Sequence, residues 1–212
     1  MSPTVASAKR RDLRDAILDA ALAVFHRDGY ADANVDEIAR TAGVAKPTIY
    51  NHFGDKANLF VETIRRGAAR SNERISGVID SIDVHPDDLR TELQRVGAAL
   101  VGCLTDTEGV AVMHLQLAER PRFGELLDEL RTTNRERTID RLAGKLAQLS
   151  AVGRLRPSNP NLAARHLMAL VSDDLLARSG FGAIRLRADE VAAPVSAGIA
   201  TFLAAFGTAR PV

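Results

Sequence analysis

Residues 46–52 carry side chains that are unusual for a solvent-exposed helix but suited to contacts with nucleic acid. They are Lys46, Pro47, Thr48, Tyr50, Asn51 and His52. An ordinary solvated helix face uses mainly Glu and Lys. Hydroxyl, amide, imidazole and ammonium groups are the ones that hydrogen-bond to phosphates and base edges. The segment therefore indicates a nucleic-acid-contacting surface, provided that a stable scaffold presents it.

The residues on either side supply such a scaffold. Two apolar sets at helical spacing flank Gly43: Val35, Ile38 and Ala39 before it, and Val44, Ile49 and Phe53 after it. Asn34 is a favourable N-cap for the first of these helices. Gly43 permits the positive φ angle that a short inter-helix turn requires. The pattern predicts a helix-turn-helix whose second helix is anchored by Ile49 and Phe53.

An amphipathic helix is predicted upstream, between a cap at Asp12 and a stop at Gly29. Its apolar residues step by three and four: Leu13, Ala16, Ile17, Ala20, Ala21, Val24 and Phe25. Such a stripe provides a floor for the two helices that follow. Residues 12–54 are thus expected to form one small domain, preceded by a flexible basic tail over 1–11 that holds Lys9, Arg10 and Arg11.

This segment closely resembles the N-terminal domain of TetR-family transcriptional repressors. The likeness rests on Ala20, Phe25, Gly29, Tyr30, Ile38, Ala39, Ala42, Gly43, Val44, Lys46, Tyr50, His52, Phe53, Lys56 and Leu59. The remainder of the chain resembles the C-terminal domains of the AefR-like branch. The resemblance implies an all-α fold of about nine helices, with an N-terminal three-helix DNA-binding domain and a C-terminal helical ligand-binding and dimerisation domain over 55–212.

The resemblance also implies roles for seven residues: Lys46, Pro47, Thr48, Tyr50, Asn51, His52 and Lys56. Tyr50 and Lys56 would contact phosphates, with Lys46 and Thr48 assisting at the helix start. Asn51 and His52 would read bases, with Pro47 making apolar contact. Thr48 has an alternative capping or solvated role, and Asn51 an alternative solvated one.

The chain departs from the family at the start of this helix. Many relatives have Ser or Thr where Ala45 stands, and the loss of such a cap typically costs about 1 kcal/mol. Pro47 partly offsets the loss, because a proline in the first turn leaves no backbone bond unmade.

The C-terminal region reads as further helices separated by short breaks. They are expected over about 55–81, from the segment 84–88 onward, from Thr107 to Pro121, over about 123–152, over about 160–180, and in a last helix that begins at Pro194 or, with a kink, at Asp189. The last two of these helices, over about 160–180 and from Asp189 or Pro194 onward, are the candidate homodimer interface. Its apolar seam is formed by Val195, Ile199, Phe202 and Phe206. Asp173 and Asp174 would either pair with arginines of the partner or be solvated.

A pocket for a small-molecule effector is implied by the resemblance. Its candidate residues are Leu100, Cys103, Val110, Met113, His114, Leu117, Phe123 and His166, each of which also has an ordinary role in core packing. With seven Phe, two Tyr and no Trp in the chain, an aromatic cage for a cation is not favoured. A moderately lipophilic, neutral or anionic effector is preferred.

Composition fits a soluble two-domain helical protein, for which the cytoplasm is the expected location. The 212 residues are 46% hydrophobic and 26% charged, with one cysteine, and no apolar run approaches the roughly 20 residues of a membrane span. No cofactor, metal or membrane partner is expected. Net charge gives no indication of DNA binding, because residues 1–60 hold eight basic and eight acidic residues. A homodimer on an inverted-repeat, double-stranded operator would compensate for modest affinity per monomer.

Three alternatives to a ligand-released repressor remain. A transcriptional activator is compatible with the same residues. A helical protein-interaction module without ligand control is favoured by the neutral charge of residues 1–60. An enzyme is not expected, because the chain has no nucleophile elbow, zinc-protease motif, phosphate loop or dinucleotide fingerprint.

Overall fold

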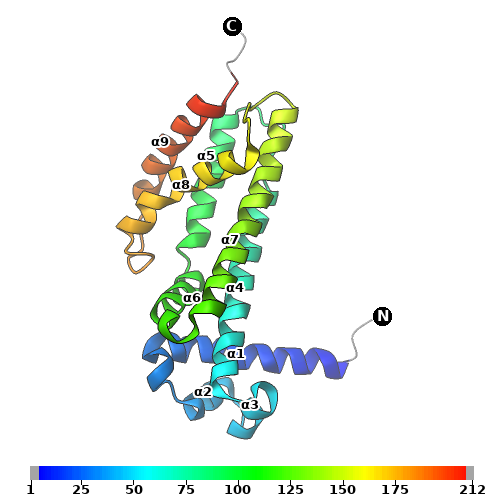
Figure 1. Cartoon of the computed structure of the whole chain (residues 1–212), viewed down its shortest axis with the longest axis vertical. Coiled ribbons are helices and arrows are strands. Elements are labelled where there is room, and N and C mark those ends of the chain that lie inside the picture. Colours follow the sequence, from blue (N-terminus) through cyan, green and yellow to red (C-terminus); the bar gives the residue numbers. More distant parts are fainter. Residues whose placement is uncertain (1–4, 209–212) are drawn as a thin grey trace. The chain divides into compact units, whose positions relative to one another are not determined.

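The computed structural model describes the backbone of residues 5–208 and the side chains of residues 12–208. Over the described backbone the chain forms nine helices and one isolated bridge, between Leu155 and Gly207 (Figure 1). The predicted all-α fold is confirmed. The helices are α1 Val5–Asp32, α2 Val35–Ala42, α3 Lys46–Phe53, α4 Lys56–Asp80, α5 Leu89–Leu104, α6 Thr107–Ala118, α7 Arg120–Ala151, α8 Pro160–Arg178 and α9 Ala188–Phe206.

The chain divides into two compact units. One comprises Met1–Ala69 and Ala111–Leu130, and the other comprises Arg70–Val110 and Arg131–Val212. The first unit therefore holds more than the helix-turn-helix domain expected to end at residue 54, because parts of α4, α6 and α7 pack with it.

Aromatic contacts explain why α7 contributes to the first unit. The ring of Phe123 lies 4.9 Å from that of Phe60 on α4 and 5.1 Å from that of Tyr30 on α1. These side chains join the core around Phe25, which is fully buried. Gly67 lets α4 approach α6 closely, because a Cβ there would come within 2.4 Å of a Val112 methyl carbon.

The first helix differs from the prediction at both ends. Its backbone is helical from Val5, so residues 5–11 belong to α1 and Asp12 lies inside the helix instead of at its N-cap. Residues 1–4, and the side chains of the expected basic tail, lie outside the described residues. Gly29 interrupts the helix with φ 74° and ψ 171°, and one further turn reaches Asp32.

The second unit is built on α5, α8 and α9, with the remaining parts of α4, α6 and α7. Asn159 caps α8 by accepting a hydrogen bond from the amide of Leu162 at 3.1 Å. Helices α8 and α9 cross closely, because a Cβ on Gly198 would lie 2.3 Å from the Leu170 carbonyl oxygen. The last helix starts at Ala188 and runs through Pro194, so the earlier of its two expected starts is the observed one.

The predicted boundary between α6 and α7 at Pro121 is wrong. Helix α6 ends at Ala118, and Pro121 lies in the first turn of α7, where a missing amide hydrogen leaves no bond unmade. The residue that departs from helical geometry is Phe123, with φ −123° and ψ 23°.

Helix α9 also corrects the expectation that no segment matches a membrane span. Within the described residues, Ala188–Phe206 is long and apolar enough to cross a bilayer. Helices α5 and α6 reach this length and apolarity only if the pair, which is bent by 56°, is counted as one broken span. Core helices of soluble proteins share this composition. In α9, Val195, Ile199 and Phe202 are buried within the second unit.

Candidate nucleic-acid interface

Helix α2 is closed at both ends by the residues that the sequence singled out. The side-chain oxygen of Asn34 accepts a hydrogen bond from the amide of Asp36 at 2.8 Å. At the other end, Gly43 has φ 68° in the left-handed region. Its amide donates to Arg40 and the next amide, of Val44, donates to Ala39, which is the paired-bond pattern of a Schellman cap. These bonds set where α3 begins.

Helix α3 starts without a side-chain cap, as expected from Ala45. The Ala45 carbonyl accepts a hydrogen bond from the Thr48 amide at 2.9 Å, and Pro47 occupies the first turn. At its end, the Gly54 amide donates to the Tyr50 carbonyl at 2.8 Å.

Two side chains hold α3 against the unit and leave the others outward. Ile49 is 1% exposed and Phe53 is 6% exposed. Four predicted DNA-contacting side chains are exposed, Lys46, Pro47, Tyr50 and Asn51, whereas Thr48, His52 and Lys56 are half-buried. The structure thus gathers six of the seven predicted residues on one helix, with Lys56 at the start of the next.

The ammonium group of Lys46 already has an ionic partner. Its Nζ lies 2.9 Å from an Asp36 carboxylate oxygen, and both side chains are substantially exposed. The hydrogen bond to Asp36 raises the pKa of Lys46 above its usual value. The side chain therefore stays charged at neutral pH, but a phosphate must compete with Asp36 for it.

Lys56 is also engaged in the isolated chain. Its Nζ donates a hydrogen bond to the Ala31 carbonyl at 3.0 Å and sits 5.0 Å from the centre of the Tyr30 ring. These contacts fix the charge at the junction between α1 and α4.

One basic residue near α3 was not among the predicted contacts. The Arg40 side chain at the end of α2 is 78% exposed, and its only ion pair among the described residues is a long one of 3.5 Å to Glu37. The signal was present in the sequence, since Arg40 and Lys46 are the only basic residues of a stretch over 38–54 that contains no acid.

Family models match both regions of the chain. The model described as bacterial regulatory proteins, tetR family, matches residues 17–63. The model described as AefR-like transcriptional repressor, C-terminal domain, matches residues 91–208, which is more than half of the chain. The chain belongs to the TetR family. The resemblance inferred from the helix-turn-helix residues is confirmed, and so is the AefR-like character of the C-terminal region.

Individual relatives of this TetR-family regulator include proteins of opposite regulatory sign. It is 36% identical over 91 residues to the HTH-type transcriptional activator FasR of Mycolicibacterium smegmatis, covering 43% of this chain and 38% of FasR. It is 27% identical over 179 residues to the HTH-type transcriptional repressor AcnR of Corynebacterium efficiens, covering 80% of this chain and 83% of AcnR. The matched part spans about 38% of the length of the first curated relatives.

A solved structure matches nearly the whole fold. It is that of a putative TetR-family transcriptional regulator from Mesorhizobium loti, with a TM-score of 0.85 and 28% identity over 93% of this chain and 98% of that one. The order of helices described above is therefore shared with an experimentally determined relative.

The eight candidate effector residues do not come together within either unit. Leu100, Cys103, Val110 and His166 belong to the second unit, whereas Met113, His114, Leu117 and Phe123 belong to the first. Leu100 and Val110 are buried, and His166 is exposed. Phe123 belongs to the aromatic core of the first unit, because its ring packs on Phe60. Cys103 is half-buried, and burial raises the pKa of its thiol.

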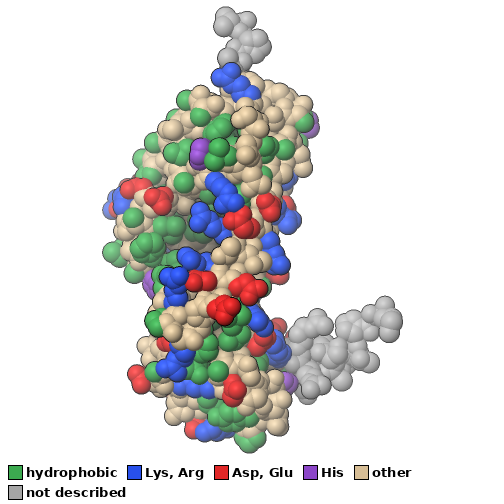
Figure 2. Space-filling model, viewed as in Figure 1, with side chains coloured by type: hydrophobic (Ala, Val, Ile, Leu, Met, Phe, Trp, Pro, Cys, Tyr) green, Lys and Arg blue, Asp and Glu red, His purple; other side chains and the backbone are tan. Residues whose placement is uncertain are grey.

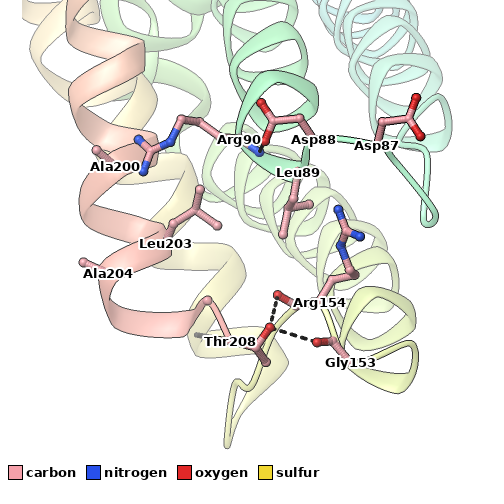
Figure 3. Close-up of a pocket in the computed structure, with 11 residues that line it drawn as sticks. Asp87, Asp88, Leu89, Arg90, Gly153, Arg154, Ala200, Leu203, Ala204 and Thr208 are labelled. Carbon is pink, nitrogen blue, oxygen red and sulfur yellow. Dashed lines mark hydrogen bonds between the residues drawn. The ribbon is translucent and has the colours of Figure 1, made fainter. Parts of the chain in front are cut away.

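A cavity of about 610 Å³ lies elsewhere in the second unit (Figure 3). It is bordered by the start of α5, the turn after α7 and the end of α9. Figure 3 shows Arg90 and Arg154 among its charged side chains, with Leu89 and Leu203 as apolar ones. Arg154 donates a hydrogen bond to the Pro86 carbonyl at 2.7 Å. None of the eight candidate effector residues lines it, and no metal-binding group of three or more ligands occurs among the described residues.

The apolar seam of α9 that was predicted to mediate dimerisation faces the core of the second unit. Val195, Ile199 and Phe202 are at most 1% exposed and belong to the core of the second unit. Phe206 is half-buried and packs 5.0 Å from the Phe202 ring. The regular spacing of these residues corresponds to the side of α9 that faces the core. A partner subunit would therefore have to contact other side chains of this helix.

The outward faces of α8 and α9 offer a different apolar surface. On α8 the exposed side chains include Leu162 and Leu170, which are 47% and 39% exposed, and on α9 they include Ala197 and Ala204. Hydrophobic atoms are visible on the upper part of the molecule in Figure 2. Asp173 and Asp174 are exposed, and Asp174 lies 3.7 Å from Arg178 of its own helix.

Proposed function

We propose that this TetR-family protein is a cytoplasmic transcriptional regulator that binds an inverted-repeat DNA operator through α3. The observation that carries the proposal is the division of α3 into a buried side, Ile49 and Phe53, and an outward side that presents Tyr50 and Asn51. In helix-turn-helix proteins, the second helix of the motif enters the major groove. Repression is the preferred outcome, with activation as the alternative.

The two outward side chains should have separable effects on DNA binding. After an operator is selected from a random DNA pool, Tyr50→Ala should weaken binding to operator and to unrelated duplex by a similar factor, because a phosphate contact carries no sequence information. Asn51→Ala should relax preference at particular base pairs, by about 1–3 kcal/mol for each bidentate hydrogen-bonding pair that the substitution removes. Fluorescence anisotropy with single-base operator variants measures both effects.

A matched control is Gln116→Ala, which removes an amide from α6 in the same unit. It should leave affinity and base preference unchanged. If Tyr50→Ala and Asn51→Ala both behaved like this control, α3 would not be the DNA-reading helix.

We also propose that the protein acts as a homodimer through the outward faces of α8 and α9. Leu162 and Leu170 lie on the i, i+4, i+8 series of α8, and the close crossing at Gly198 places α9 beside Leu170. Two neighbouring helices with exposed apolar faces suit a symmetric four-helix contact.

A charge on this surface should dissociate the dimer without unfolding the chain. Leu170→Glu would place an unpaired carboxylate in the interface and should shift the protein to monomer in sedimentation equilibrium. Val152→Glu is the matched control, since Val152 is 42% exposed in the turn directly after α7. A Leu170→Glu protein that remained as dimeric as this control would show that the contact lies elsewhere.

We propose that a small molecule releases the DNA by binding in the helical C-terminal region. Four of the eight predicted residues, Leu100, Cys103, Val110 and His166, belong to the second unit. A neutral or anionic lipophilic compound is the preferred class. Effectors of this kind act through a difference in affinity between two conformations, typically worth about 1–3 kcal/mol. A thermal-shift screen followed by operator titration tests the proposal.

A further inference from the structure

Basic side chains of α1, α2 and α3 are paired with acids at the start of α2. Besides the Lys46–Asp36 pair of 2.9 Å, Glu37 accepts a hydrogen bond from Arg27 at 2.8 Å and lies 3.5 Å from Arg40. Asp36 and Glu37 are neighbours in the first turn of α2. The two carboxylates thus pair with three cations of the first unit, of which Arg27 also pairs with Asp28 at 2.6 Å.

These ion pairs are exposed and therefore exchangeable. The Lys46 and Asp36 side chains are 44% and 60% exposed, and the Arg27 side chain is 56% exposed. Exposed pairs are weak because water screens them. A DNA phosphate can replace Asp36 as the partner of Lys46, although the displaced carboxylate then stands close to the phosphate.

We propose that Asp36 and Glu37 act as internal competitors for DNA phosphates and so set the salt dependence of binding and limit affinity for DNA of any sequence. This inference rests on the proposed DNA-binding function. In the free protein the charge of Lys46 is already balanced by Asp36. When Lys46 leaves Asp36 to bind a phosphate, fewer ions are released than when an unpaired lysine binds the phosphate. The arrangement gives a physical reason for the neutral charge balance of residues 1–60.

A simpler role for the same acids is helix stabilisation. Negative charge in the first turn of a helix is favourable because of the helix dipole. That role predicts a change in the stability of α2 when a carboxylate is removed, but it predicts no change in the salt dependence of DNA binding. The slope of log affinity against log salt concentration therefore separates the two roles.

The experiment uses the full chain and short duplexes of random sequence, with the selected operator in parallel. Asp36→Asn should steepen the salt slope by about 0.9, the value for one additional phosphate neutralised. Its affinity should therefore fall about 3.5-fold further than that of the wild type between about 50 and 200 mM salt. In the double variant Asp36→Asn/Lys46→Met this steepening should disappear, because it depends on the freed lysine.

Glu125→Gln is the charge-matched control, because Glu125 is exposed on α7 of the first unit and pairs with no basic group among the described residues. An Asp36→Asn slope equal to that of wild type and control would overturn the inference and leave the proposed function intact. Steepening that persisted in the double variant would overturn it as well. Absence of any duplex binding by the wild type at low salt would overturn the proposed function itself, and the inference with it.

Discussion

Replacing Phe202 with Glu should unfold the second unit rather than release a folded monomer. The Phe202 side chain is fully buried and packs beside Phe206 within the core. Removing a buried aromatic ring typically costs about 3–5 kcal/mol, and an unpaired carboxylate in the same place adds a desolvation penalty. The total approaches the roughly 5–15 kcal/mol by which whole domains are stable. Circular dichroism and chemical denaturation would measure the loss.

Leu170→Glu is the informative comparison, because it adds the same charge to a side chain that is 39% exposed. It should keep its helical content and cooperative unfolding. A folded, stable Phe202→Glu protein would contradict the core position of this ring, and only a folded monomer would again favour the α9 seam as the dimer interface.

Gly198→Ala should destabilise the second unit although alanine is the better helix former. The added methyl group would lie 2.3 Å from the Leu170 carbonyl oxygen and 2.8 Å from its carbonyl carbon, both of which are backbone atoms. Helices α8 and α9 would have to separate, and overpacking of this kind typically costs about 1–3 kcal/mol. The free energy of unfolding in urea measures the effect.

Gly144→Ala is the matched control on α7. A Cβ at this position meets no heavy atom within 4 Å, so the substitution should stabilise the protein by about 0.5–1 kcal/mol through helix propensity. Equal effects of the two substitutions would mean that α8 and α9 do not cross closely at Gly198.

The helix-turn-helix segment was predictable because its geometry is set by local bonds. Asn34, Gly43 and Pro47 act on neighbouring backbone groups, and their caps and turns appear where the sequence placed them. Once both helices are positioned, the spacing of Ile49 and Phe53 determines which side of α3 is buried. The outward position of Tyr50 and Asn51 follows without knowledge of distant contacts.

The side of α9 that faces the core was not predictable, because helical spacing is compatible with two arrangements. The stripe through Val195, Ile199 and Phe202 is equally suited to a core and to a partner, and small residues on the rest of α9 leave no strongly polar face to decide between them. Phe123 was likewise placed among pocket residues, although it completes the aromatic core around Phe60. Such choices depend on which side chains arrive from other helices.

The sequence by itself determined the family, the helical fold and the residues that α3 turns outward. Only the tertiary structure decided that Lys46 is paired with Asp36, that α7 contributes to the first unit, and that the α9 seam is buried. The physical reason is the range of the interactions. Caps, turns and helical periodicity act within a few residues, whereas ion pairs between helices and core packing depend on how separate helices cross.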